Sequence, residues 1–460
     1  MFKVKNVVAL LIFLICFSCS KDDSLVDIGY EERIFSFEFN KDNNAIKVDS
    51  RGSIRQNIIE VFLPPGTDKS SLVPTFEKKE DTRIEVNGKE VISGKTSVDF
   101  TSGAAFTVIA SDHTIVEYTV IVVTDDLEID GMIQRLMDDF NVPGLQLSIV
   151  YKERLVYSKS YGLADVENNV PVNNESLFRI ASISKVLTVL GVLKLIENDQ
   201  LTFSDKVFGN EGILEYDFGT PPYPQNMEEI TVLHLLEHKS GWKNTPYDPV
   251  FRNEEFTQTE MINEVIDNRP NSEPGGDSYY LNFGYILLGR VIEKVSGLDY
   301  ESYINQKILN PIGIDDMAIA SNSIEEKAPN EVIYYPQENF DPYTMNVRRM
   351  DAAGGWIAST KDLTKLLIHI DRNTHVDDIL TSSSLDYSYL AYSTWIFNGG
   401  FAGTNSSVSR INNELGSSII VNTRIPGGEI TSALNDFMTE DIDQRLRWAP
   451  YDLFLIESEN

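Results

Sequence analysis

A serine and a lysine three residues apart stand at the head of an apolar run. Ser182 and Lys185 are followed by residues 186–196, which are apolar on nearly every side and predict a buried helix. On a helix this spacing places both side chains on one face, within reach of each other. Burial disfavours an ammonium ion, which favours Lys185 as a base. The helix amino terminus offers N–H groups to an anionic intermediate at Ser182.

A tyrosine and an asparagine form a second candidate pair. Tyr280 and Asn282 follow the Pro-Gly-Gly sequence 274–276, which indicates a loop, and precede the apolar run 283–292. We expect both residues on a turn just before a buried helix. Each spacing also occurs elsewhere in the chain, so neither pair identifies a site by itself.

Composition excludes several classes of function. The 460 residues include 39 Lys+Arg and 70 Asp+Glu, a formal net charge of −31, and such a surface repels nucleic acid. Hydrophobic residues make up 42% of the chain, enough for packed cores. Both cysteines lie within the first 19 residues, and the five histidines form no metal-binding pair of the HExxH kind. We expect no metal and no cofactor.

The amino terminus has the pattern of a lipoprotein signal. Residues 7–17 form an apolar run behind Lys3 and Lys5, too short to span a bilayer and typical of a secretory signal. The following Ser-Cys-Ser-Lys-Asp-Asp resembles the cleavage box of bacterial lipoproteins and the acidic export signal of surface lipoproteins in the Bacteroidetes group. The resemblance implies a signal peptide at 1–18, a lipidated Cys19, a tether at 19–27 and attachment to the outer membrane, on either face. An ordinary cleaved signal is the alternative.

Two bodies follow the tether. Residues 28–125 alternate with period two in several short runs, such as 34–39 and 59–63, which predicts a small all-β sandwich. It resembles the immunoglobulin-like spacer modules of the same lipoproteins, and a ligand-binding role is the alternative to a spacer. From residue 127 to 460 helical periods alternate with strands, which predicts an α/β domain.

Five segments in order carry a second resemblance. The Ser-x-x-Lys at 182–185 and the loop at 274–282 are accompanied by segments 230–242, 309–314 and 352–363. Together they resemble the serine β-lactamase-like hydrolases, which include class C β-lactamases, D-Ala-D-Ala carboxypeptidases and related esterases. This resemblance implies an antiparallel sheet with helices on both faces plus a helical region. It also implies an acyl-enzyme on Ser182, proton transfer by Lys185 and Tyr280, and a substrate oriented by Asn282.

The third motif of that family departs from its pattern. The family has Lys-Thr-Gly or His-x-Gly there, and the register with the segment 400–404 places the motif on Phe397, Asn398 and Gly399. We expect these three residues to contact the substrate, and the N–H groups of Ser182 and Gly400 to form an oxyanion hole. Because Phe397 cannot pair with a carboxylate, the departure favours neutral esters or amides and predicts that β-lactams are excluded.

The sequence therefore predicts a monomeric, lipid-anchored serine hydrolase. Its substrate is a small molecule or peptide, cleaved at an ester, amide or peptide bond outside the cytoplasm. Two alternatives stay open: a non-catalytic binding module on the same fold, and a D-Ala-D-Ala carboxypeptidase or β-lactamase.

Overall fold

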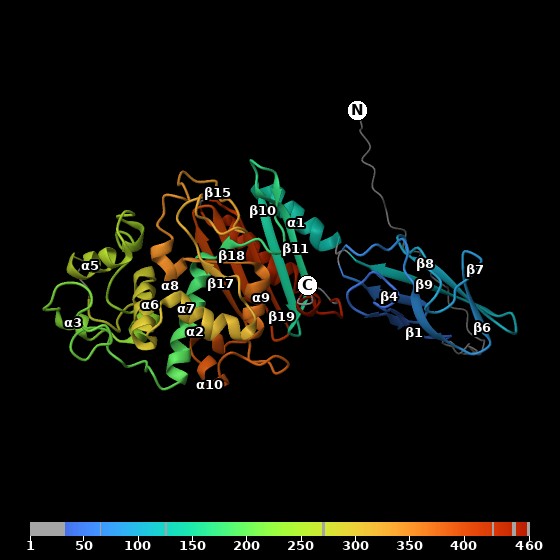
Figure 1. Ribbon diagram of the computed structural model, residues 1–460, viewed down its shortest axis with the longest axis horizontal. Coiled ribbons are helices and arrows are strands. Elements are labelled where there is room, and N and C mark those ends of the chain that lie inside the picture. Colours follow the sequence, from blue (N-terminus) through green and yellow to red (C-terminus); the bar gives the residue numbers. More distant parts are fainter. Residues whose placement is uncertain are drawn as a thin grey trace, which may run out of the picture.

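The computed structural model describes residues 33–64, 66–124, 127–268, 272–425, 427–443 and 448–457. The predicted signal peptide, Cys19 and tether lie outside these residues. An all-β amino-terminal part lies to one side of a larger part that combines helices with a central sheet (Figure 1). Within the described ranges, no helix has the length and apolar character needed to cross a membrane.

The amino-terminal part is built from two sheets with the strand orders β2-β1-β5 and β3-β4-β9-β8-β6-β7. Alternate side chains of its strands enter a shared core rich in phenylalanine rings, as the period-two pattern predicts. Pairing is antiparallel except between β4 and β9, which run parallel. The strands are β1 Ile34–Phe39, β2 Ser50–Arg51, β3 Ser53–Arg55, β4 Ile58–Phe62, β5 Pro74–Lys78, β6 Thr82–Val86, β7 Lys89–Glu90, β8 Ala104–Ala110 and β9 Ile115–Val123.

A six-stranded antiparallel sheet organises the larger part, with the order β12-β11-β10-β19-β18-β17. Its central strands are buried on both faces: β10 and β19 consist mainly of apolar and small residues, whereas β18 is rich in serine. Strand β17 forms one edge, and the candidate site lies there. The strands are β10 Gly144–Tyr151, β11 Arg154–Asp165, β12 Val170–Pro171, β17 Trp395–Phe401, β18 Thr404–Arg410 and β19 Leu415–Val421.

Helices cover both faces of this sheet. Helices α1 (Leu127–Phe140) and α11 (Glu429–Asp436) share one core with alternate residues of β10 and β19. Helix α9 (Thr360–Ile368) packs on the other face, together with the core of the helical region. This arrangement, with a separate all-β region before it, confirms the predicted fold class.

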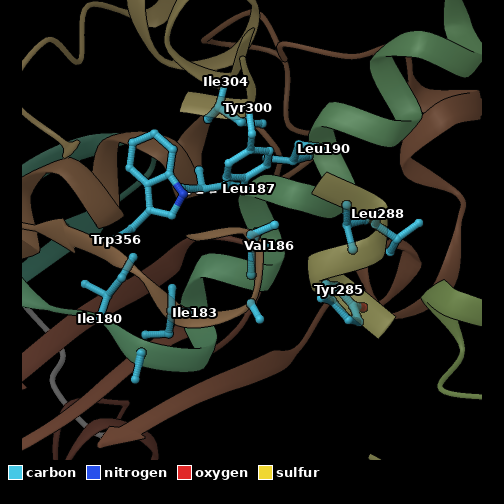
Figure 2. Packing of buried hydrophobic residues seen from close by; sticks show 14 of the residues in the cluster. Ile180, Ile183, Val186, Leu187, Leu190, Tyr285, Leu288, Tyr300, Ile304 and Trp356 are labelled. Carbon is cyan, nitrogen blue, oxygen red and sulfur yellow. Dashed lines mark hydrogen bonds between the residues drawn. The ribbon is translucent and has the colours of Figure 1, made fainter. Parts of the chain in front are cut away.

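Two long helices position the candidate site. Helix α2 (Ser184–Glu197) is buried on nearly every side, as predicted, and packs against α6 (Asn282–Ser296). Figure 2 shows Leu187 and Leu190 of α2 at the ring of Tyr300, in a buried cluster that also contains Val186 of α2 and Leu288 of α6. The turn that leads into α2 packs against the edge strand β17, and the first residue of α6, Asn282, contacts Lys185 of α2.

Short elements complete the larger part. A three-stranded sheet has the order β13-β16-β14, and β15 pairs in parallel with β20. These strands are β13 Phe178–Arg179, β14 Ala318–Ile319, β15 Tyr335–Pro336, β16 Trp356–Ala358 and β20 Thr423–Arg424. The remaining α-helices of the described residues are α3 Gln225–Glu228, α4 Val232–Leu236, α5 Gln258–Asn268, α7 Tyr300–Ile304, α8 Asp351–Gly354, α10 Ser382–Leu385 and α12 Leu453–Glu457.

Candidate active site

Ser182 lies in a 3₁₀ turn, Ala181–Ile183, that leads into α2. The sequence predicts Ser182 in the first turn of the helix itself, but the chain enters through Ala181 in a left-handed conformation with φ +47°. For a residue with a side chain this conformation costs about 1–3 kcal/mol. The turn is held in place because Ile180 donates its N–H to Trp356 O at 3.0 Å and accepts a hydrogen bond from Ser406 Oγ at 2.9 Å.

Lys185 is buried, and its Nζ contacts three oxygens. It lies 3.2 Å from Ser182 Oγ, 2.6 Å from Asn282 Oδ1 and 2.6 Å from Ala353 O. Burial lowers the pKa of Lys185 to about 7, against a smaller opposing effect of the nearby Asp248 carboxylate. A neutral amine has two donors and one lone pair. Donation to Asn282 and Ala353 therefore leaves the lone pair directed at the Ser182 hydroxyl.

Tyr280 faces Ser182 from the segment just before α6. Its hydroxyl donates to Ser182 Oγ at 2.7 Å. The ring is half-exposed, but burial of the hydroxyl end raises the pKa of Tyr280 above its ordinary value. The phenol therefore stays protonated at neutral pH and acts as a donor. Ser182 Oγ thus has a hydrogen-bond donor on one side and a base on the other.

His238 fixes the orientation of the tyrosine ring. Its ring lies 4.7 Å from that of Tyr280 and 5.1 Å from that of Tyr285, centroid to centroid. Its Nδ1 accepts the N–H of Leu281 at 3.2 Å. Burial, with a contribution from Lys185, lowers the pKa of His238 to about 4, so the imidazole is neutral and packs as an aromatic ring.

Asp248 is a residue of the site that the sequence analysis missed. Its Oδ2 accepts two hydrogen bonds from Asn282, at 2.6 Å from the backbone N and 3.0 Å from Nδ2. The amide of Asn282 is therefore held with Nδ2 toward Asp248 and Oδ1 toward Lys185. Burial raises the pKa of Asp248, and the two N–H groups of Asn282 act against that rise. The one local signal is the Asp-Pro pair at 248–249, which is typical of a helix cap and not of catalysis.

A cleft of about 620 Å³ opens over these groups. Ser182, Tyr280 and Asn282 line it from the helical side, and Gly400 lines it from β17. The structure therefore brings together the predicted nucleophile, its phenol partner, the predicted substrate-orienting amide and both predicted oxyanion-hole residues, Ser182 and Gly400. Exposed aromatic side chains form much of the remaining wall: Tyr247, Phe251 and Phe340.

The structure does not bring Phe397, Asn398 and Gly399 into this cleft. Phe397 packs on Trp395 at 4.7 Å and lines a small apolar crevice with residues of α2 and α9. Asn398 is exposed on the edge strand and is not among the residues that line the cleft. Gly399 has a packing role: a Cβ there would lie 2.1 Å from Ile180 O, so only glycine lets β17 approach the nucleophile turn this closely.

The arrangement can support nucleophilic acyl transfer. A serine hydroxyl hydrogen-bonded to a base of pKa near neutrality has the geometry of an activated nucleophile. The main-chain N–H groups of Ser182 and Gly400 require no cation to stabilise an oxyanion. Among the described residues, no group of three or more His, Cys, Asp or Glu side chains is placed to hold a metal ion.

Two family models match this chain. A family model described as "Beta-lactamase" matches residues 129–404, and one described as "SGBP, N-terminal" matches residues 34–122. Penicillin-binding protein 4* of Bacillus subtilis is 29% identical over 39% of this chain and 38% of its own. Beta-lactamase-like protein 2 of Dictyostelium discoideum is 27% identical over 46% of this chain and 39% of its own. The chain spans about two fifths of the length of the curated relatives it matches.

Solved structures show the same fold at low identity. D-amino acid amidase from Ochrobactrum anthropi SV3 superposes with a TM-score of 0.55 at 20% identity, covering 69% of this chain and 99% of that one. A penicillin-binding protein from Bacillus halodurans superposes with a TM-score of 0.55 at 18% identity, covering 66% of this chain and 99% of that one. Since the beta-lactamase family model matches more than half of the sequence, the chain belongs to the beta-lactamase family.

Proposed function

We propose that this member of the family is an active serine hydrolase that forms an acyl-enzyme on Ser182 and cleaves an ester, amide or peptide bond. One observation carries the proposal. Ser182 Oγ accepts a hydrogen bond from Tyr280 at 2.7 Å and lies 3.2 Å from the Nζ of a lysine whose pKa is near 7. A pocket that only binds a ligand has no need of a nucleophile with its base and proton donor in place.

Acylation follows from these contacts. Ser182 Oγ attacks the carbonyl carbon while its proton passes to Lys185 Nζ, and the carbonyl oxygen becomes an oxyanion near the N–H groups of Ser182 and Gly400. When the intermediate collapses, the bond to the leaving group breaks. Tyr280 delivers a proton to the leaving group and is reprotonated from Lys185.

Deacylation reverses the proton path. Lys185, neutral again, and Tyr280 take a proton from a water molecule, which attacks the acyl carbon. The bond between that carbon and Ser182 Oγ breaks, Oγ regains a proton and the acid leaves. Asn282, locked by Asp248, holds Lys185 in place through its Oδ1 and lines the cleft where the substrate lies.

The proposal extends to the cellular setting. A lipid on Cys19 would tether the protein to the outer membrane, and the all-β region would act as a spacer that holds the hydrolase away from the bilayer. Supporting this are the lipoprotein-like residues 18–23 and the match of residues 34–122 to the SGBP amino-terminal family model. Metabolic labelling with an alkyne fatty acid tests it: the full chain should carry the label, and a Cys19→Ala variant should not.

Hydrolysis of a chromogenic ester tests the catalytic proposal. Ser182→Ala should lower kcat/KM for 4-nitrophenyl acetate by about 10³-fold or more. Ser204→Ala, an exposed serine outside the cleft, serves as the matched control and should leave the rate unchanged. Equal activity of the Ser182→Ala and wild-type proteins would refute the proposal.

A further inference from the structure

We propose that Arg424 binds a carboxylate of the substrate, in place of the cation that is missing at Phe397. The inference rests on the proposed hydrolase function and specifies its substrate class. Phe397 alone predicts that carboxylates are not recognised, because no cation stands at that position of β17. Phe397 itself lies outside the cleft, but folding brings a cation from a different strand, β20, into it.

Arg424 lies beside the predicted oxyanion hole. It ends β20, which pairs in parallel with β15, and it lines the cleft together with Ser182 and Gly400. A Cβ built on Gly400 would lie 3.9 Å from Arg424 Nε, so the side chain passes next to that residue. Among the described residues that line the cleft, Arg424 is the only lysine or arginine.

The guanidinium keeps donors available for a ligand. Its ion-pair partner among the described residues is Glu338, whose Oε1 lies 3.7 Å from Nη1. Charge-assisted N–H···O bonds are about 2.7–2.9 Å long, so this pair is too long to be one. The Arg424 side chain is 41% exposed and that of Glu338 is 22% exposed, which leaves room for a ligand to reach the guanidinium.

The chemistry of the cleft selects a carboxylate with an apolar body. An arginine presents a planar fork of donors that matches the two oxygens of a carboxylate. Phe340, Met345 and Phe401 also line the cleft and offer apolar contact area. Asp248 and Glu338 also line the cleft, and the chain carries a net charge of −31, so an anionic substrate would be repelled without a local cation.

Two pairs of esters measure this recognition. In the first pair the carboxylate is on the acyl part: the mono-4-nitrophenyl ester of adipic acid against its methyl ester. In the second pair it is on the leaving group: 3-acetoxybenzoate against methyl 3-acetoxybenzoate. The readout is the ratio of kcat/KM for the acid to kcat/KM for the neutral ester. Each member of a pair has the same scissile bond, so the ratio isolates the charge.

Arg424→Gln should lower this ratio about 10- to 100-fold in at least one pair and leave the neutral esters within about twofold, since a charged hydrogen-bonded pair is lost. Glu338→Gln should have the opposite effect. Removing the carboxylate that competes for Arg424 should raise the acid-to-neutral ratio about threefold or more. A purely structural role for Arg424 would change both esters of a pair equally. Unchanged ratios in both pairs would overturn the proposal.

A binding measurement separates this proposal from the catalytic one. In the Ser182→Ala background, calorimetric titration with the same esters reads affinity without turnover. Arg424→Gln should weaken binding of the acid about tenfold and not that of the methyl ester. Hydrolysis that depends on Ser182 but shows no charge preference would refute the role of Arg424 and leave the proposed function standing. Charge-selective binding without hydrolysis would refute the proposed hydrolase function and leave the role of Arg424 standing.

Discussion

Asp248 and Asn282 are joined by two hydrogen bonds to a single carboxylate oxygen, at 2.6 Å from the backbone N–H and 3.0 Å from the side-chain amide. This pair decides which end of the Asn282 amide faces Lys185. If the amide turned over, its NH₂ group would face the Lys185 amine, and both would be donors. Asp248 is therefore a positioning residue for the catalytic lysine.

Replacing the Asp248 carboxylate should weaken catalysis by Lys185 while leaving the lysine itself in place. In Asp248→Asn the Asn282 amide loses its fixed orientation, and we expect kcat/KM for a neutral ester to fall about 10- to 100-fold. Loss of the negative charge also lowers the pKa of Lys185 further, because Asp248 opposes its depression. The ascending limb of the pH profile should therefore move to lower pH. Asp267 accepts a hydrogen bond from Thr220 and lies outside the cleft, so Asp267→Asn is the matched control. It should change neither kcat/KM nor the position of the ascending limb of the pH profile.

The pH dependence of kcat/KM should follow Lys185. Only the neutral amine can accept the Ser182 proton, and its pKa lies near 7. Activity should therefore rise about tenfold per pH unit below 7 and level off above it. Stopped-flow measurement with 4-nitrophenyl acetate between pH 5 and 9 tests this, and a flat profile over that range would exclude Lys185 as the base.

The phenol of Tyr280 should be required for proton transfer. Tyr280→Phe removes the hydroxyl that lies 2.7 Å from Ser182 Oγ, and we expect kcat to fall about 10²- to 10⁴-fold. Tyr279→Phe deletes the same atom one residue away, outside the cleft, and should retain full activity. Similar rates for the two variants would assign Tyr280 a packing role only.

Alanine should be damaging at Gly399 but tolerated at the adjacent Gly400. A Cβ at position 399 would lie 2.1 Å from Ile180 O, whereas one at position 400 would meet nothing closer than 3.4 Å. Gly399→Ala should therefore displace β17 from the nucleophile turn, lowering both the melting temperature and the activity. Gly400→Ala keeps the backbone N–H of the proposed oxyanion hole and should stay within about tenfold of wild type. Equal tolerance at both positions would contradict the role given to Gly399.

Much of the fold can be predicted because its signals are local. The period-two run at 34–39 becomes strand β1, the run at 59–63 falls mostly on β4, and the apolar run after Ser182 becomes the buried helix α2. The contact between Ser182 and Tyr280, 98 residues apart, was expected only from a family resemblance. No periodicity in the sequence predicts it.

The missed residues depend on tertiary pairing. Asp248 is one of 70 acidic residues, and nothing in its neighbourhood distinguishes it until Asn282 is placed against it. Arg424 and Glu338 reach the cleft through the pairing of β15 with β20, two strands of two residues each, too short to recognise in a sequence. Conversely, Phe397 was placed at the site by register, but its side chain turns to an apolar crevice.

Covalent labelling tests the central claim most directly. A fluorophosphonate probe reacts with a serine only when a base has activated it, and intact-mass analysis reads the adduct without any knowledge of the substrate. We expect one adduct per chain in the wild-type protein at pH 8, a much slower reaction in Lys185→Ala, and none in Ser182→Ala. An unmodified wild-type protein, or an adduct that persists in Ser182→Ala, would contradict the assignment of Ser182 as the nucleophile.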